Sequence, residues 1–208
     1  DNLIGGIKEN IIPQVDYHNF DILDTAKLKE TMEGCEIAFH AAALPYEGLS
    51  VFSPKLCVES IVSGTVSMAS AAIATGVKRF INCSSMARYG QGQPPFMETH
   101  KTNPVDPYGL AKVQAEQQLA LLNKIHGLNY TTIVPHNVIG VGQRYNDPFR
   151  NVVAIMISRV LMRQSIIIYG DGQQTRSFSN VKDCVDAIWK IMTSDRDLCG
   201  QVYNIGPD

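Results

Sequence analysis

The chain has 208 residues, of which 45% are hydrophobic and 18% charged, and its formal net charge is −2. This length supports one sizeable hydrophobic core with room for a small second lobe, and the slight negative charge gives no basic field to hold a nucleic-acid backbone. We expect no membrane span, because no uninterrupted apolar stretch approaches the roughly 18–20 residues required, and we find no signal-peptide pattern.

The first half of the chain alternates short apolar segments with helical patterns. We predict strands over residues 15–20, 36–40 and 80–84, and a short helix over 25–33. A longer helix rich in alanine, serine and valine is predicted over 53–75 and should end at Gly76. Such alternation indicates parallel strands joined by right-handed crossovers.

The second half begins with another long helix. Asp106 is a suitable N-cap and Pro107 a suitable first helical residue, so we predict a helix that reaches residue 125 and stops at Gly127. The later elements are a strand over 130–134, a helix over 149–163, a strand over 166–169, a turn at Asp171-Gly172, a helix over 181–192 and a strand over 202–205.

These elements predict an α/β fold with a doubly wound, Rossmann-like parallel sheet and part of a small substrate-binding lobe. The chain opens with Asp1 and contains no Gly-x-Gly-x-x-Gly loop, so the sheet is expected to lack its first strand and glycine-rich turn. We assign residues 1–137 and 177–200 to an incomplete dinucleotide-binding domain, and residues 138–176 and 201–208 to the partial lobe. The chain is expected to be truncated at both ends.

Tyr108 and Lys112 stand four residues apart near the start of the second long helix. Residues with this spacing share a helix face, and a nearby ammonium lowers the pKa of a phenol, which is about 10 when unperturbed. The pair can therefore act as a general acid/base, although chance can also supply a half-buried tyrosine beside a solvated lysine. Ser85 follows the strand over 80–84, at the sheet edge where α/β proteins bind ligands.

The cysteines and histidines favour neither disulfides nor a metal. The five cysteines are scattered, odd in number and without a Cys-x-x-Cys pair, which is typical of reduced thiols in a cytoplasmic protein. The five histidines form no His-x-x-x-His or Cys/His cluster, so we expect no metal site.

Taken in order, the motifs of the chain resemble the extended short-chain dehydrogenase/reductases, and within them the NAD-dependent nucleotide-sugar epimerases of the UDP-galactose 4-epimerase type. The resemblance covers nearly the whole chain. It rests on Asp1-Asn2-Leu3, Phe20-Asp21-Ile22, His40-Ala41-Ala42, Ser84-Ser85 with Tyr89-Gly90, Pro107-Tyr108-Gly109 with Lys112, Pro135-His136-Asn137-Val138, Arg150-Asn151-Val152, Gly170-Asp171-Gly172 with Arg176, and Asn204-Ile205-Gly206.

The resemblance implies an NAD-dependent isomerase that interconverts nucleotide sugars at C4 through a transient 4-keto sugar. It implies a catalytic set of Ser85, Tyr108 and Lys112. The cofactor-binding residues that it implies are Asp1, Asn2, Asp21, Ile22, Ala41 and Ala42, together with Tyr108 and Lys112. It places the nucleotide diphosphate sugar at Ser85, Asn137, Asn151, Val152 and Arg176, and it implies a homodimer through the helices over 53–75 and 107–125.

Departures from the family pattern leave other interpretations open. Ile61 stands where the family usually has an asparagine and cannot form a hydrogen bond. Without the resemblance, Asn137 and Asp21 are equally turn residues, Arg176 a solvated charge and Asp1 a terminus without a fixed role. A reductase or dehydratase of the same family, or a non-catalytic nucleotide-sugar-binding relative, therefore stays as an alternative.

Overall fold

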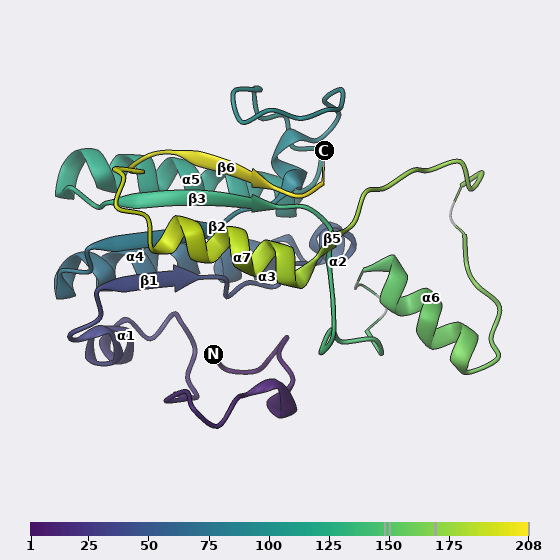
Figure 1. Ribbon diagram of the computed structural model, residues 1–208, viewed down its shortest axis with the longest axis horizontal. Helices are drawn as coiled ribbons and strands as arrows, with labels where there is room; N and C mark the ends of the chain where they lie inside the picture. The colour runs from purple at the N-terminus through teal and green to yellow at the C-terminus, as the bar shows by residue number, and fades with distance from the viewer. Residues whose placement is uncertain (148, 150, 169, 208) are drawn as a thin grey trace.

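The computed structural model describes residues 1–147, 149, 151–168 and 170–207. Its main sheet has four parallel strands in the order β1-β2-β3-β6 (Figure 1). These strands are β1 (Ile37–His40), β2 (Arg79–Cys83), β3 (Tyr130–Pro135) and β6 (Val202–Ile205). A separate parallel pair is formed by β4 (Val138–Ile139) and β5 (Ser179–Asn180).

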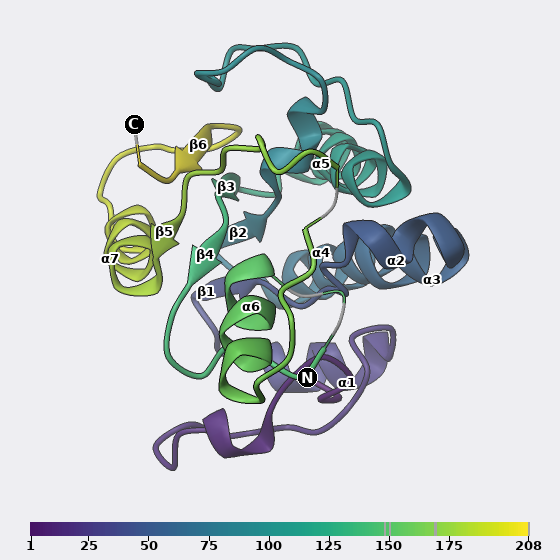
Figure 2. The same ribbon diagram turned by 90° about the vertical axis from the view of Figure 1, so that its right-hand side faces the viewer.

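Helices cover both faces of the main sheet, as predicted for a doubly wound fold (Figure 2). On one face, α1 (Thr25–Met32), α4 (Gly64–Thr75) and α5 (Pro107–His126) pack over a core that includes Phe80 and Leu119. On the other face, α7 (Val181–Met192) covers Ile81 and Ile133. The remaining helices are η1 (Lys8–Asn10), α2 (Glu47–Phe52), α3 (Pro54–Val58), the π-helical segment η2 (Glu59–Ser63), η3 (Met86–Tyr89) and α6 (Val152–Leu161).

Helix α5 begins and ends at the residues that the sequence indicates. The Asp106 side chain accepts a hydrogen bond from the Gly109 backbone N–H at 2.8 Å, and Pro107 fills the first turn. Gly127 ends the helix with a φ of 71°, a left-handed conformation that glycine adopts without steric cost. The predictions for this helix and for the strands over 36–40, 80–84, 130–134 and 202–205 are confirmed to within one or two residues.

The long helix predicted over 53–75 is present as α3, η2 and α4, with a π-helical turn in its middle. By length and mean hydropathy alone, 54–75 is long and apolar enough for a membrane span. Its residues Ala69, Ala71 and Ala72 are fully buried against the sheet and α1. Core helices of globular domains share the same apolar composition, so the packing accounts for it.

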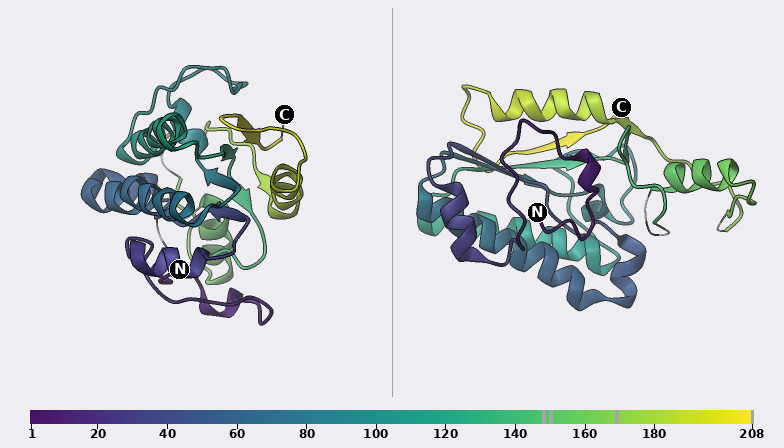
Figure 3. Two further views of the ribbon diagram at one scale, coloured as in Figure 1. Left: turned by 90° about the vertical axis from the view of Figure 1, so that its left-hand side faces the viewer. Right: turned by 90° about the horizontal axis from the view of Figure 1, so that it is seen from below.

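Two predicted strands are wrong. Residues 15–20 contain no strand and run beside the β1 edge of the sheet with the rest of the amino-terminal segment (Figures 1 and 3). Within the described chain β1 pairs only with β2, so this apolar segment has no ladder partner for its backbone groups. Residues 166–168 are also irregular and leave Ile168 63% exposed, so apolar character alone did not make them a strand.

The elements after β3 differ in their bounds and in their place in the fold from those predicted. The helix predicted over 149–163 is shorter and spans Val152–Leu161. Arg150, Tyr169 and Asp208, which fall in predicted elements or in the predicted lobe, lie outside the described residues. Strand β6 pairs with β3 in the main sheet, although the predicted domain division gives residues 201–208 to the small lobe. The division as a whole stays a prediction.

Candidate active site

Ser85 and Tyr108 meet at the carboxyl end of β2. Ser85 follows the strand and caps η3, because its Oγ accepts a hydrogen bond from the Ala87 backbone N–H at 3.2 Å. Tyr108 lies in the first turn of α5 with only 6% of its surface exposed. Gly109 allows this approach, since a Cβ there would stand 2.6 Å from the Ala87 carbonyl oxygen. A small residue in the helix therefore brings α5 against the segment that carries Ser85.

Lys112 completes the group from the second turn of α5. Its Nζ lies 5.8 Å from the centroid of the Tyr108 ring and donates a hydrogen bond to the Cys83 carbonyl oxygen at 2.7 Å. Lys112 is 7% exposed, so its ammonium is held by β2 and not by solvent. The structure thus brings Ser85, Tyr108 and Lys112 together, as the sequence predicts.

The environment of Tyr108 departs from one expectation. Burial is the largest influence and raises the pKa of Tyr108 well above its ordinary value, whereas the side chain of Ser85 acts in the opposite direction by hydrogen bonding. The expectation of a lowered Tyr108 pKa is therefore wrong as a net effect in the chain by itself. Desolvation and the neighbouring Cys83, Glu47 and Cys57 all disfavour the phenolate, and the hydrogen bond from Ser85 offsets them only in part.

Ile61 contributes to that burial. It lies in the π-helical segment η2, is 1% exposed, and packs in one apolar cluster with Tyr108, Cys57 and Ala111. Having isoleucine here, where the family usually has asparagine, therefore makes the surroundings of Tyr108 more apolar. An aliphatic side chain fills the space beside the phenol ring and offers it no hydrogen bond.

Six predicted cofactor-binding residues line a cavity that is separate from the group of Ser85, Tyr108 and Lys112. An open cavity of about 410 Å³ is lined by the predicted set Asp1, Asn2, Asp21, Ile22, Ala41 and Ala42. Gly5, Gly6 and Ser60 also line it. Four segments that are separated in the sequence therefore form one concave surface beside β1.

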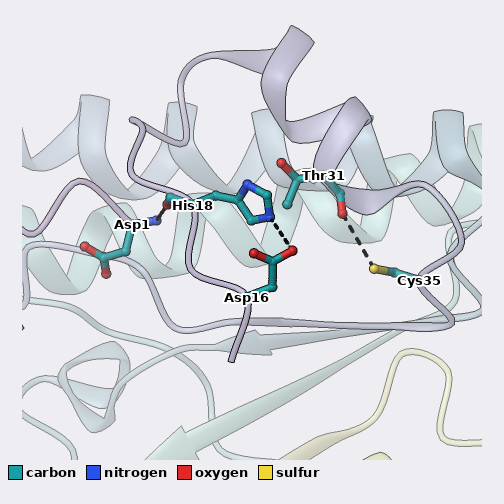
Figure 4. A network of polar contacts seen from close by, with 5 residues as sticks. All are labelled: Asp1, Asp16, His18, Thr31 and Cys35. Carbon is teal, nitrogen blue, oxygen red and sulfur yellow. Dashed lines mark hydrogen bonds and ion pairs between the residues drawn. The ribbon is translucent and has the colours of Figure 1, made fainter. Parts of the chain in front are cut away.

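Local hydrogen bonds shape the amino-terminal wall of this cavity. One Asp1 carboxylate oxygen accepts from the Leu3 N–H at 2.6 Å, and the Asn2 side chain donates to Asp21 Oδ2 at 2.9 Å. The amino group of Asp1 donates to the backbone oxygen of His18 at 3.3 Å, as Figure 4 shows, and this contact holds the first residues against the segment 16–18.

These residues fit the adenosine half of a dinucleotide. A carboxylate can accept hydrogen bonds from two ribose hydroxyls, and the small Ala41 and Ala42 side chains let a ligand approach the backbone at the end of β1. A negative charge at Asp1 also disfavours a 2′-phosphate on that ribose. The helix N-terminus that usually cradles the pyrophosphate is not encoded in this sequence.

The four predicted nucleotide-sugar residues beyond Ser85 are less well assembled. Asn137 donates to the Ser177 carbonyl oxygen at 3.0 Å and holds the segment that precedes β5. Asn151 caps α6, and Val152 is 43% exposed on that helix, which stands apart from the sheet (Figures 1 and 3). Arg176 is exposed. Within the described chain, these residues do not form one enclosed pocket with Ser85.

Two carboxylates near the catalytic group were not singled out from the sequence. The pKa of Glu47 in α2 is raised by loss of solvent and by Asp106, while Arg176 opposes the rise, so Arg176 does lie within electrostatic range of this end of the sheet. Glu116 accepts a hydrogen bond from the Ser84 hydroxyl. Its spacing of four residues from Lys112 was a signal that could have placed it on the same helix face.

No group of three or more His, Cys, Asp or Glu side chains that could hold a metal occurs among the residues that the structure describes. The catalytic group offers a phenol, an ammonium and a hydroxyl, and the cavity beside β1 is lined by other residues.

Known proteins resemble the chain in both sequence and structure. The model of the NAD dependent epimerase/dehydratase family matches residues 2–206. A putative UDP-glucose 4-epimerase of Methanocaldococcus jannaschii is 35% identical over 90% of this chain and 62% of its own length. A UDP-N-acetyl-alpha-D-glucosaminuronate decarboxylase of Bacillus cytotoxicus is 30% identical over 90% of this chain and 59% of its own.

The fold agrees with these relatives. The crystal structure of UDP-glucose 4-epimerase from Thermotoga maritima with UDP-glucose superposes with a TM-score of 0.92 at 31% identity, over 99% of this chain and 67% of that one. The chain thus spans about three fifths to two thirds of the length of these relatives.

Proposed function

Because the chain belongs to the NAD dependent epimerase/dehydratase family, we propose that it supplies the proton-handling part of a nucleotide-sugar 4-epimerase that uses NAD. The observation that carries this proposal is the meeting of Ser85, Tyr108 and Lys112 at the carboxyl end of β2. The proposed substrates are UDP-glucose and UDP-galactose, since relatives with these activities in their names resemble the chain over most of its length.

In the proposed reaction, Tyr108 as phenolate accepts the proton of the sugar 4-hydroxyl and later returns it. Ser85 donates a hydrogen bond to the reacting oxygen and so fixes its distance from the phenol. Lys112, held by the Cys83 carbonyl, supplies the positive charge that favours the phenolate. NAD, held by the residues of the cavity beside β1, would supply a reversible hydride acceptor for C4, so that the epimerisation needs no net oxidation.

Because Tyr108 is buried, the proposed reaction needs a further interaction that favours its phenolate form. Since desolvation keeps the phenol protonated in the chain by itself, proton transfer needs added positive charge when the ligands bind. When bound, NAD would supply such a charge on its oxidised nicotinamide ring. We therefore propose that Tyr108 becomes an effective base only in the ternary complex.

Asp1, Asn2, Asp21, Ile22, Ala41 and Ala42 are the proposed contacts for the adenosine half of NAD. We propose that Arg176 binds the diphosphate of the substrate, because its guanidinium can hold two phosphate oxygens at once. Asn137, Asn151 and Val152 are proposed to contribute to the same site.

Tyr108→Phe tests the proposed role of the phenol. The epimerase reaction should fall by about 10²–10⁴-fold, whereas binding of UDP-glucose measured by calorimetry should change little. Conversion of UDP-galactose to UDP-glucose is followed by the anomeric proton signals in NMR spectra. Turnover by the variant at the rate of the unaltered protein would contradict the assignment.

The same spectra separate the alternative reactions. A 4-epimerase changes only the configuration at C4, whereas a dehydratase gives a deoxy-keto sugar and a decarboxylase gives a pentose and carbon dioxide. A deoxy sugar, or a pentose from a uronic acid substrate, would replace the epimerase proposal by another activity of the same family. Binding without any product would favour a non-catalytic relative.

We also propose a homodimer and a cytoplasmic location. Leu110, Leu121 and Ile125 are 48%, 51% and 62% exposed and recur on one side of α5, and Val58 of α3 is 41% exposed. Two copies could bury these side chains against each other. Sedimentation velocity should show a dimer that Leu121→Glu converts to a monomer, and a monomer at all concentrations would contradict the proposal.

A further inference from the structure

A buried cluster of three polar side chains lies directly behind the proposed catalytic group. Arg88 Nη2 and Glu116 Oε2 form an ion pair at 2.8 Å, and the two side chains are only 8% and 13% exposed. The Ser84 hydroxyl donates to the other carboxylate oxygen of Glu116. One carboxylate therefore binds two residues of the segment that surrounds Ser85.

The positions of these residues in the chain matter for the site. Glu116 lies one helical turn after Lys112 and two turns after Tyr108 on α5. Ser84 precedes Ser85, and Arg88 follows it by three residues in η3, where the Arg88 N–H donates to the Ser85 carbonyl oxygen at 3.1 Å. The cluster thus connects the helix that carries Tyr108 and Lys112 to the segment that carries Ser85.

Burying the Arg88–Glu116 ion pair between η3 and α5 carries a large desolvation penalty. Nε and Nη1 of Arg88 are buried without a hydrogen-bond partner among the described residues, and its guanidinium otherwise rests 5.2 Å from the Tyr89 ring centroid. Apolar side chains of similar volume often give equal or greater stability than a buried ion pair. The arrangement is therefore better explained by what the charges do than by the stability they provide.

The charges act on Lys112. Its Nζ donates to the Cys83 carbonyl, and the Glu116 carboxylate is the nearest acid on the same helix face. Burial lowers the pKa of Lys112, and Glu116 counteracts this effect. Burial raises the pKa of Glu116, and Arg88 is the largest opposing influence. Arg88 thus favours the ionised form of Glu116 and occupies one of its two carboxylate oxygens.

We propose that Arg88 and Glu116 are positioning residues, which balance the charge behind Lys112 so that its ammonium stays against the Cys83 carbonyl and the Tyr108 ring. The inference deepens the proposed function, since it rests on Lys112 serving Tyr108 there. Without Arg88, the unpaired Glu116 carboxylate would attract Lys112 along the helix and away from the phenol. Without Glu116, Arg88 would repel Lys112 and disfavour its ammonium.

Other titratable groups also face Lys112 and Tyr108 and must be held constant in any test. They are His40 of β1, Glu47 of α2, Cys57 of α3 and Cys83 of β2, and Asp106 at the start of α5 acts in turn on Glu47 and Cys57. None of them is altered in the variants below.

The test is an NMR titration of the Lys112 side chain in this chain alone, with Lys112→Met used for assignment. Arg88→Met should raise the midpoint of the Lys112 titration by about one pH unit, and Glu116→Gln should lower it by a similar amount. Arg88→Lys should keep the midpoint, and the double variant Arg88→Met/Glu116→Gln should return it close to the original value. In Arg88→Met, the nuclear Overhauser effect between the Lys112 and Tyr108 side chains should weaken.

The opposite signs distinguish charge balance from simple damage to the structure, which would move both midpoints the same way. Equal shifts in one direction, or no shift in either variant, would overturn the proposal. Glu116→Gln is isosteric, so it keeps the test valid if Arg88→Met does not fold. Glu36→Gln, which breaks the exposed pair of Glu36 with Lys78, is the control and should leave Lys112 unchanged.

The titration needs neither NAD nor a nucleotide sugar. A chain that shows the expected shifts but no epimerase activity with either sugar would contradict the proposed function and leave the charge balance intact. A chain that is active but lacks the shifts would contradict only the positioning role.

Discussion

The catalytic end of the sheet and the amino-terminal wall of the cofactor cavity are built in different ways. Ser85 follows β2, and Tyr108 and Lys112 come from α5, where contacts with Ser50 and Cys83, far away in the chain, fix them. Asp1, Asn2 and Asp21 are exposed and held by hydrogen bonds within an irregular segment. The proton-handling group is therefore preorganised by the sheet, whereas the cavity wall depends on local turns.

The largest difference is expected in stability. Leu119 is fully buried in the core between α5 and the sheet, so Leu119→Ala should lower the free energy of unfolding by about 2–5 kcal/mol. Ile12 is 57% exposed in the amino-terminal segment, and Ile12→Ala should cost less than about 0.5 kcal/mol. Urea denaturation measures both, and equal losses would show that the amino-terminal segment is part of the cooperative core.

We expect acid to lower the free energy of unfolding mainly through His40 in strand β1 of the main sheet. Burial lowers the pKa of His40 to about 3, while its Nε2 contacts Thr65 Oγ1 at 3.0 Å. The unfolded chain, with an ordinary histidine pKa near 6.5, binds the extra proton between about pH 6.5 and 3, so stability is full above this window and falls as the pH decreases through it.

The slope from His40 alone is about 1.4 kcal/mol for each pH unit inside that window. Urea midpoints measured from pH 7 to pH 4 should therefore fall more steeply in the unaltered chain than in His40→Gln. The exposed His18 provides the matched control, and His18→Gln should keep the steep fall. A slope that survives His40→Gln would assign the acid sensitivity to other groups.

A smaller and more local effect is expected at the cavity wall. Asp21 Oδ2 accepts the hydrogen bond from Asn2, and its Oδ1 accepts from the Leu23 N–H. Asp21→Ala should weaken NAD binding by about tenfold in calorimetry, because one charged hydrogen-bonding group is lost. Stability should change by less than about 1 kcal/mol, and a larger loss would mean that the wall supports the fold.

The smallest expected change compares two helix caps. Asp106→Ala removes the side chain that caps α5, and Asn151→Ala removes the cap of α6. The first should cost about 1 kcal/mol of global stability, because α5 packs on the sheet. The second should leave the urea midpoint nearly unchanged, since α6 stands apart from the sheet (Figure 1). Equal effects would contradict this view of α6.

Local sequence signals were sufficient for the regular elements around the site. Asp106, Pro107 and Gly127 indicated where α5 begins and ends, because caps act within one turn of the chain. The apolar runs that became β1, β2 and β3 were also recognisable. Residues 15–20 had a similar apolar character but formed no strand, since a ladder partner is a property of the whole sheet and not of the segment.

The sequence by itself determined the α/β class, the α5 helix and the four-residue step from Tyr108 to Lys112, because these depend on backbone propensities and helix periodicity. Only the tertiary structure decided the environment of that pair. It placed Ile61 beside the phenol, directed Lys112 to the Cys83 carbonyl and set Arg88 against Glu116. Burial and charge at a side chain are sums over neighbours from several elements, so no local pattern could have shown that the Tyr108 pKa is raised.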